Sequence, residues 1–202
     1  MTETKASIRK HLLRKRLQLT EKEVRSFSKR ILNRLTKTDQ FKKARTILLY
    51  SPIKNEVDPT PLFEKYATEA TGTTKKTFAL IRVCKNNRIH IHKITDLNTL
   101  QTGRFNIKEP TSKHPKITRR EDLDLIITPG LAFDPNGHRI GYGKGYFDKL
   151  FKNLSTKSAK CAKVALAYDF QIIENIPADK HDQKVDLIIT EKRIVRPHKQ
   201  TT

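Results

Sequence analysis

The segment "LDLIITPGLAFDPNGHRIGYGKGYFDKLF", residues 123–151, combines an apolar run, a glycine-rich loop and the start of an amphipathic helix. Its first six residues form a near-continuous apolar run, and residues 163–168 and 185–190 repeat this pattern. Such runs are typical of strands that are buried on both faces, as in a parallel sheet flanked by helices. The glycine-rich loop follows the carboxyl end of one of these strands, and α/β proteins bind ligands at that edge of the sheet.

The remaining sequence pattern agrees with one α/β domain. A first helix is predicted at residues 4–19, and a second begins at a capping box formed by Thr20 and Glu23. A third is predicted after Asp58, which would cap it, with Pro59 in its first position. Strands are predicted at residues 45–51, 77–83 and 88–94, with a turn around Asn86–Asn87 between the last two, and residues 95–120 are predicted to be loop. We therefore predict a mostly parallel sheet flanked by helices on both faces, a Rossmann-like three-layer sandwich. The single domain would span residues 1–202, with its core at about residues 4–196.

The formal net charge is +21, and residues 1–50 carry 15 Lys or Arg against 4 Asp or Glu. Such a charge attracts polyanions, so a basic α/β nucleic-acid-binding protein is one interpretation, and a solvated lysine-rich surface is the other. The sequence contains no RNP-like aromatic strand, zinc knuckle or Arg-rich tail that would favour the first. The N-terminus lacks a hydrophobic signal core, and no apolar run approaches the roughly 20 residues that span a bilayer. We expect a cytoplasmic monomer without membrane contact, with Cys84 and Cys161 as free thiols.

Five of the seven glycines lie in residues 129–151. Glycines let backbone amides approach a ligand closely, and the loop leads into a predicted helix N-terminus, which favours an anion. Arg139 and Lys144 add positive charge, so the loop is predicted to bind a phosphate. It is neither a Walker A loop nor the dinucleotide fingerprint, because Gly145 follows Lys144 and Tyr146 replaces the third glycine. The alternative is a simple turn between strand and helix.

Three cations of the first predicted helix share its apolar arc. At about 100° per residue, Lys5, Arg9 and Arg16 fall on the same side as the leucines, so they point toward the protein or toward a bound ligand. The alternative is that these side chains snorkel to solvent or pair with acids.

Asp148 in the first turn of the helix after the glycine loop also has two interpretations. It could complement the helix dipole, or it could bind a magnesium ion that offsets its repulsion of a phosphate on the same turn. His90 and His92 would share a strand face, which suits either a metal site or ordinary half-exposed histidines.

At these residues the sequence resembles the 5-formyltetrahydrofolate cyclo-ligase (methenyltetrahydrofolate synthetase) family. The family's K-x-x-x-R pattern matches Lys5 and Arg9, and its acidic residue after the first strand matches Glu56. Its signature P-G-x-x-F-D…R-x-G-x-G-x-G-[YF]-[YF]-D matches residues 129–148, and "IPADKHDQKVDLIIT" matches its C-terminal segment. Phe147 stands where many members have a second tyrosine, and Tyr142 where some have arginine.

The resemblance implies an enzyme that uses ATP as co-substrate and Mg²⁺ to convert 5-formyltetrahydrofolate, possibly polyglutamated, to 5,10-methenyltetrahydrofolate. The formyl oxygen would be phosphorylated, N10 would close the ring, and ADP and phosphate would be released. The residues implied for ATP binding are Lys5, Arg9, Arg139, Ile140, Gly141, Tyr142, Gly143, Lys144, Gly145, Tyr146 and Phe147. The resemblance implies substrate contacts for Glu56, Tyr142 and Tyr146, catalytic roles for Lys144 and Tyr146, and magnesium binding for Asp148 and Asp186. The carboxylate of Glu56 would accept paired N–H donors of the pterin.

Overall fold

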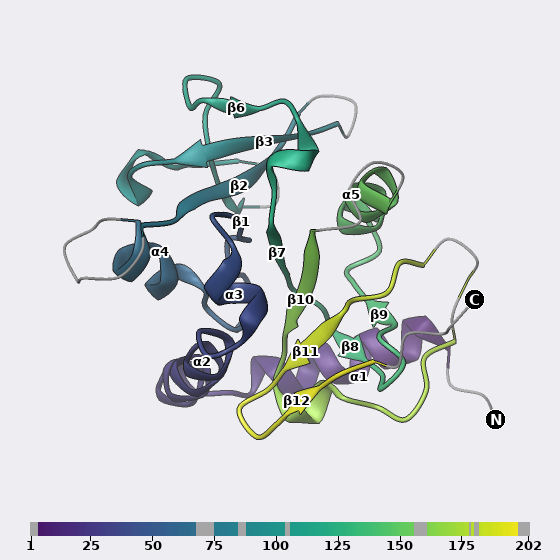
Figure 1. Ribbon diagram of the computed structural model, residues 1–202. Coiled ribbons are helices and arrows are strands. Elements are labelled where there is room, and N and C mark those ends of the chain that lie inside the picture. Colours follow the sequence, from purple (N-terminus) through teal and green to yellow (C-terminus); the bar gives the residue numbers. More distant parts are fainter. Residues whose placement is uncertain are drawn as a thin grey trace.

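The computed structural model describes residues 4–67, 75–84, 88–103, 106–155, 161–177, 179 and 182–197. An eight-stranded sheet forms its centre, in the order β12-β11-β10-β7-β1-β2-β3-β6 (Figure 1). The strands are β1 (Thr46–Leu48), β2 (Thr77–Val83), β3 (Ile89–Ile94), β6 (Lys116–Ile117), β7 (Leu125–Thr128), β10 (Ala162–Leu166), β11 (Leu187–Ile189) and β12 (Ile194–Val195). The five strands from β11 to β2 are parallel, and β12, β3 and β6 pair antiparallel at the two edges.

Helices cover both faces of this sheet (Figure 1). They are α1 (Lys5–Leu17), α2 (Glu21–Leu35), α3 (Asp39–Lys43), α4 (Thr60–Tyr66) and α5 (Tyr146–Ser155). One apolar core joins the sheet to α2, α3 and α4 through side chains such as Ile31, Phe41 and Phe63. A second core on the opposite face joins the sheet to Leu150 and Phe151 of α5. The predicted three-layer α/β architecture with a mostly parallel sheet is therefore confirmed.

Helix α1 packs away from the main cores, against a small hairpin. The hairpin consists of β8 (Ala132–Phe133) and β9 (Arg139–Ile140). Ile8 and Leu12 of α1 form a buried cluster with Ala132, Ile140 and Ile176. Because β9 leads directly into the glycine loop, this packing places the N-terminal helix beside that loop although the two are more than a hundred residues apart in sequence.

Single hydrogen bonds define three local features, of which the capping box at the start of α2 confirms a prediction. Thr20 and Glu23 form the complete capping box at the start of α2. The turn after Asp134 is closed by a Gly137 N–H···O=C bond to Asp134 of 3.0 Å, with Gly137 at φ +87°. The Asp58 carboxylate accepts the N–H of Thr60 at 2.9 Å, but α4 begins at Thr60 with Pro59 as its N-cap and without a side-chain cap hydrogen bond, so the predicted capping role of Asp58 is wrong by one position.

Two regions differ from the prediction. Residues 95–120, predicted to be loop, contain β4 (Gln101–Thr102) paired with β5 (Lys108–Glu109), and also β6, which extends the main sheet. These two-residue strands are too short to produce a recognisable alternation. Helix α3 has only five residues, which are too few to show the helical periodicity of apolar residues from which a helix is predicted. The turn predicted at residues 86–87 lies outside the described residues.

Short 3₁₀ helices complete the described structure: Leu97–Thr99, Arg120–Asp122 and Asp169–Gln171. Among the described residues, no helix combines the length and apolar character needed to cross a membrane.

Candidate active site

A pocket of about 550 Å³ opens beyond the carboxyl ends of β1 and β7. Lys5 and Arg9 of α1 line it, together with Glu56 from the segment after β1. Gly130, which follows β7, and all of residues 139–148 also line the pocket. The structure therefore brings the two predicted helix cations, the predicted acidic residue and the glycine loop together in one cavity.

The glycine loop adopts a backbone that side chains would strain. Gly143 and Gly145 have φ angles of +94° and +66°, in the left-handed region that favours glycine. A Cβ atom at either position would meet no described atom within 4 Å. The glycines are thus required by the backbone conformation and not by tight packing, and the space beside the loop is open. Helix α5 begins immediately afterwards at Tyr146, as predicted.

The two cations of α1 that were predicted to face a ligand do line the pocket. The Nε of Arg9 donates to the Gly141 carbonyl at 3.0 Å, which ties α1 to the glycine loop. The Nζ of Lys5 lies 2.5 Å from carboxylate oxygens of both Asp179 and Asp182. Lys5 therefore pairs with acids, as the alternative interpretation of these cations states.

Arg16 reaches furthest into the protein. Its side chain is 1% exposed, and its Nε donates to the Lys54 carbonyl at 2.9 Å while Nη1 donates to the Gly130 carbonyl at 3.1 Å. Its Nη2 donates to the hydroxyl of Tyr142 and lies 3.7 Å from Oε1 of Glu56. Arg16 thus points inward, as its place on the helical wheel predicts, and it contacts three separate segments of the pocket wall.

Glu56 is buried beside Arg16. Its Oε2 accepts the N–H of Ile53 at 3.0 Å, whereas Oε1 has no hydrogen-bond partner among the described residues. Burial raises the pKa of Glu56 from 4.5 to about 7, although the charge of Arg16 acts in the opposite direction. Burial also raises the pKa of Tyr142 to about 12, so its hydroxyl stays protonated at neutral pH. Glu56 therefore lines the cavity while one buried oxygen of its carboxylate has no hydrogen-bond partner among the described residues.

Asp148 makes an ion pair with Arg139, with Oδ1 2.8 Å from Nη2. The guanidinium of Arg139 is buried between the rings of Phe147 and Phe151, at 5.7 and 5.8 Å from their centroids. Arg139 is therefore held by protein groups along much of its length. Asp148 lies in the first turn of α5 and also lines the pocket, so its carboxylate adjoins both the helix N-terminus and the open cavity.

The structure does not bring Asp186 together with Asp148. The carboxylate of Asp186 accepts the N–H of Lys163 at 2.8 Å, at the amino end of β10 and β11. Asp124 does the same between β7 and β1, where its carboxylate accepts the N–H groups of Arg45 and Thr46. Both aspartates fasten the start of a neighbouring strand, at the edge of the sheet opposite the pocket. The predicted magnesium pair of Asp148 and Asp186 is thus corrected, because Asp186 does not line the pocket.

The histidines also have structural partners. Nδ1 of His92 is 2.8 Å from the His114 carbonyl, and Nδ1 of His90 is 3.3 Å from the Cys84 sulfur. Within the described residues, no three His, Cys, Asp or Glu side chains lie close enough together to hold a metal ion. These contacts favour the interpretation of His90 and His92 as ordinary strand histidines, although His92 is buried and not half-exposed as predicted.

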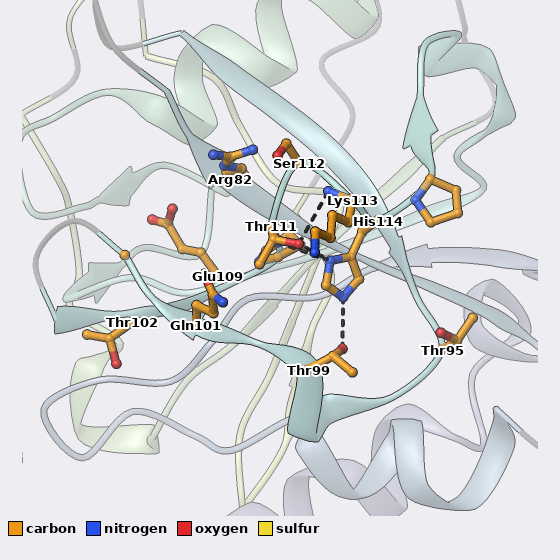
Figure 2. A pocket seen from close by; sticks show the side chains of 13 residues that line it. Arg82, Thr95, Thr99, Gln101, Thr102, Glu109, Thr111, Ser112, Lys113 and His114 are labelled. Atoms are coloured by element: carbon orange, nitrogen blue, oxygen red, sulfur yellow. Dashed lines mark hydrogen bonds between the residues drawn. The ribbon is translucent and has the colours of Figure 1, made fainter.

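A second cavity, of about 630 Å³, is lined by residues of β2, β4 and β5 and by the segment that follows β5 (Figure 2). Arg82 and Lys113 line it together with several hydroxyl groups, and it shares Glu109 with the first pocket. His114 in its wall accepts the Thr111 N–H at Nδ1, and its Nε2 is 2.9 Å from the Thr99 hydroxyl. The cavity therefore offers cations and hydroxyls, whereas its imidazole is already occupied by internal hydrogen bonds.

Sequence reasoning missed several groups of the first pocket. Asp179 and Asp182, the partners of Lys5, lie within the C-terminal segment quoted above, but nothing in that segment indicates a pairing across more than 170 residues. Tyr50, Ser51 and Lys54 also line the pocket. Their place directly after an apolar strand is the signal that could have identified them.

Comparison with known proteins agrees with this geometry. A profile of the 5-formyltetrahydrofolate cyclo-ligase family matches residues 1–191. The 5-formyltetrahydrofolate cyclo-ligase of Mycoplasma genitalium is 32% identical over 186 residues, which cover 92% of this chain and 96% of that protein. The Mus musculus enzyme of the same name is 35% identical over 113 residues, an alignment that spans about half of the mouse protein (53%) and 55% of this chain. The solved structure of Aquifex aeolicus 5,10-methenyltetrahydrofolate synthetase superposes with a TM-score of 0.81 at 37% identity, over 98% of this chain and 95% of that one.

The family match includes helix α1, the segment with Glu56 and the glycine loop, which are three of the parts of the chain that line the pocket. The likeness in sequence and the likeness in fold thus cover the same residues. The chain belongs to the 5-formyltetrahydrofolate cyclo-ligase family.

Proposed function

We propose that the protein converts 5-formyltetrahydrofolate to 5,10-methenyltetrahydrofolate at the expense of ATP, and that the reaction takes place in the 550 Å³ pocket. The observation that carries this proposal is that one cavity holds two chemically different binding regions. A buried carboxylate with an unpartnered oxygen, Glu56, lines the same space as a cation-flanked glycine loop at a helix N-terminus. The first suits the N–H groups of a pterin, and the second suits a polyphosphate.

The triphosphate would lie along the glycine loop. Backbone N–H groups of residues 141–145 and the N-terminus of α5 favour negative charge there, and the cations Lys5, Arg9 and Lys144 line the same cavity. Lys5 would exchange its contacts with Asp179 and Asp182 for phosphate oxygens. Arg139 is buried and paired with Asp148, so we assign it to shaping the loop more than to direct phosphate contact.

The donor set fits a magnesium ion only in part. Asp148 lines the pocket beside the loop and could supply one carboxylate oxygen, whereas Asp186 could not. Protein sites for Mg²⁺ in phosphoryl transfer commonly use one or two carboxylates together with substrate phosphates. We therefore propose that Asp148 holds a magnesium ion bound to ATP, and that the ion's contribution is to neutralise phosphate charge.

The chemistry requires the formyl oxygen to become a leaving group. The formyl oxygen attacks the γ-phosphorus and the bond to ADP breaks, which gives an N5-iminium phosphate. N10 then attacks the formyl carbon, its proton is released, and the C–O bond breaks to give phosphate and the methenyl product. Phosphoryl transfer depends mainly on positioning and charge stabilisation, so the roles we assign to this chain are binding and orientation. We place Lys144 at the transferred phosphoryl group and the ring of Tyr146 against the substrate.

The test is an absorbance assay of the purified protein with 5-formyltetrahydrofolate, ATP and Mg²⁺. The near-ultraviolet absorbance of the methenyl product should rise, and one ADP should form for each product molecule. Omission of ATP, or its replacement by a non-hydrolysable analogue, should abolish the rise. A flat trace with protein that unfolds cooperatively, and is therefore folded at the start, would exclude the proposed function.

A further inference from the structure

Arg16 is the largest fully buried side chain described in the protein. A guanidinium out of contact with water is costly unless its charge and its N–H groups are matched. Three carbonyl or hydroxyl oxygens accept its N–H groups, on Lys54, Gly130 and Tyr142. Since these acceptors belong to the segment before Glu56, the end of β7 and the glycine loop, one side chain joins the two ends of the pocket.

The contact between Arg16 and Glu56 is of a particular kind. At 3.7 Å, Nη2 and Oε1 are close enough for an ion pair but too far apart for a hydrogen bond. Oε1 consequently receives the charge of Arg16 without a hydrogen bond from it, and no other described group meets it in hydrogen-bond geometry, although the Tyr142 hydroxyl is near enough to lower the pKa of Glu56. The second oxygen accepts the Ile53 N–H at 3.0 Å, which holds the carboxylate at a second point.

We propose that Arg16 is a positioning residue that favours the ionised form of Glu56 against the effect of burial and orients its carboxylate, with Oε1 left without a hydrogen bond so that it can accept the N–H groups of the bound ring. This proposal rests on the function proposed above, in which Glu56 receives the pterin. The same Nη2 also donates to the Tyr142 hydroxyl, whereas the backbone of the glycine loop is tied to α1 separately, by the bond from Arg9 to the Gly141 carbonyl.

The electrostatic part of this proposal concerns a small set of neighbours. The charged or titratable groups that act on Glu56 or on its tyrosine neighbours come from five places in the chain: Arg16 of α1, Tyr50, Lys54 and Asp58 after β1, Tyr142 of the glycine loop, Tyr168 after β10, and Glu191 after β11. Of these, Arg16 and Lys54 carry positive charge, and both lower the pKa of Glu56 against the effect of burial, Arg16 the more strongly. Removal of Arg16 should therefore raise that pKa further above 7.

The experiment compares Arg16→Met and Arg16→Lys with Arg14→Met, a matched control because Arg14 is exposed on the same helix. Titration of the Glu56 side-chain carboxyl by ¹³C NMR needs no turnover. In Arg16→Met its midpoint should rise by at least about one pH unit, a tenfold change in the ionisation constant. Arg16→Lys should restore part of this shift, and Arg14→Met should leave the midpoint unchanged. Equal midpoints in the wild type and Arg16→Met would overturn the proposal.

Kinetics give the second readout. In Arg16→Met at pH 7, KM for 5-formyltetrahydrofolate should rise about tenfold or more, whereas KM for ATP should stay within about twofold. Equal increases in both constants would show that Arg16 only supports the fold, and would also overturn the proposal. If the wild type shows no turnover, the proposed function fails, and the NMR titration still decides whether Arg16 controls Glu56.

A double variant covers the case in which Arg16→Met does not fold. Arg16→Met with Glu56→Gln removes both buried charges, so neither is left unpaired. If the two residues act as a unit, the double variant should bind 5-formyltetrahydrofolate no more weakly than Glu56→Gln alone. Losses of affinity that multiply in the double variant would refute the coupling.

Discussion

The substitution Glu56→Gln should remove part of the pH dependence of the free energy of unfolding. Burial raises the pKa of Glu56 from 4.5 to about 7, so between these values the folded protein binds a proton that the unfolded chain releases. Stability must therefore fall as the pH rises through this window, because the buried carboxyl has to ionise. The whole displacement corresponds to about 3 kcal/mol, of which roughly 2.5 kcal/mol is lost between pH 5 and pH 8.

Glutamine has the size of the protonated glutamate and does not ionise. At pH 5 the variant and the wild type should have similar free energies of unfolding, since Glu56 is mostly protonated there. At pH 8 the variant should be more stable by roughly 2.5 kcal/mol, even though we expect it to bind folate poorly.

Urea unfolding of both proteins at several pH values measures this difference directly. Glu64→Gln on α4 is a suitable control, because it removes the same charge from an exposed position. Its unfolding curve should follow the wild type at every pH. Parallel losses of stability in the wild type and in Glu56→Gln between pH 5 and pH 8 would refute the reasoning that burial controls this carboxyl.

Three further predictions concern other carboxylates and cations. Arg9→Ala should raise KM for ATP about tenfold or more in initial-rate assays, since a charge-assisted contact is worth about 1.5–3 kcal/mol; an unchanged KM would remove Arg9 from the phosphate site. Asp148→Asn keeps an acceptor for Arg139, so kcat should fall at least about tenfold while unfolding changes by about 1 kcal/mol or less; a loss of stability alone would leave Asp148 as a helix cap. Asp186→Ala should lose about 1–2 kcal/mol of stability in urea, as Asp124→Ala should, with turnover unchanged in both; a loss of turnover confined to Asp186→Ala would restore its role as a metal ligand.

The features that could be predicted from sequence are those that short segments specify. Buried parallel strands need unbroken apolar runs, so β7, β10 and β11 could be recognised individually. The inward direction of Arg9 and Arg16 follows from the helical period and the leucines beside them. The glycine loop was identifiable because its backbone requires positive φ at Gly143 and Gly145.

The features that could not be predicted depend on contacts between distant segments. No local pattern indicates that Lys5 meets Asp179 and Asp182, or that Arg139 is enclosed by aromatic rings of the helix that follows it. Asp186 misled for a related reason. Its segment resembles a ligand-bearing motif, but the geometry of a parallel sheet places a residue before a strand at the amino edge, away from the pocket.

The near-identity of residues 123–128 and 185–190 has a consequence for how this chain reaches its native topology. The two segments differ only in their first residue, and they form the two neighbours of a single strand, β10. Each could supply the same backbone partners and the same side chains to that strand, so local sequence does not specify which neighbour lies on which side. The native order must be selected by the connections, residues 129–161 and 167–184, and by the handedness that crossovers between parallel strands obey. We therefore expect that an exchange of these two strands would act as a kinetic trap for a refolding chain.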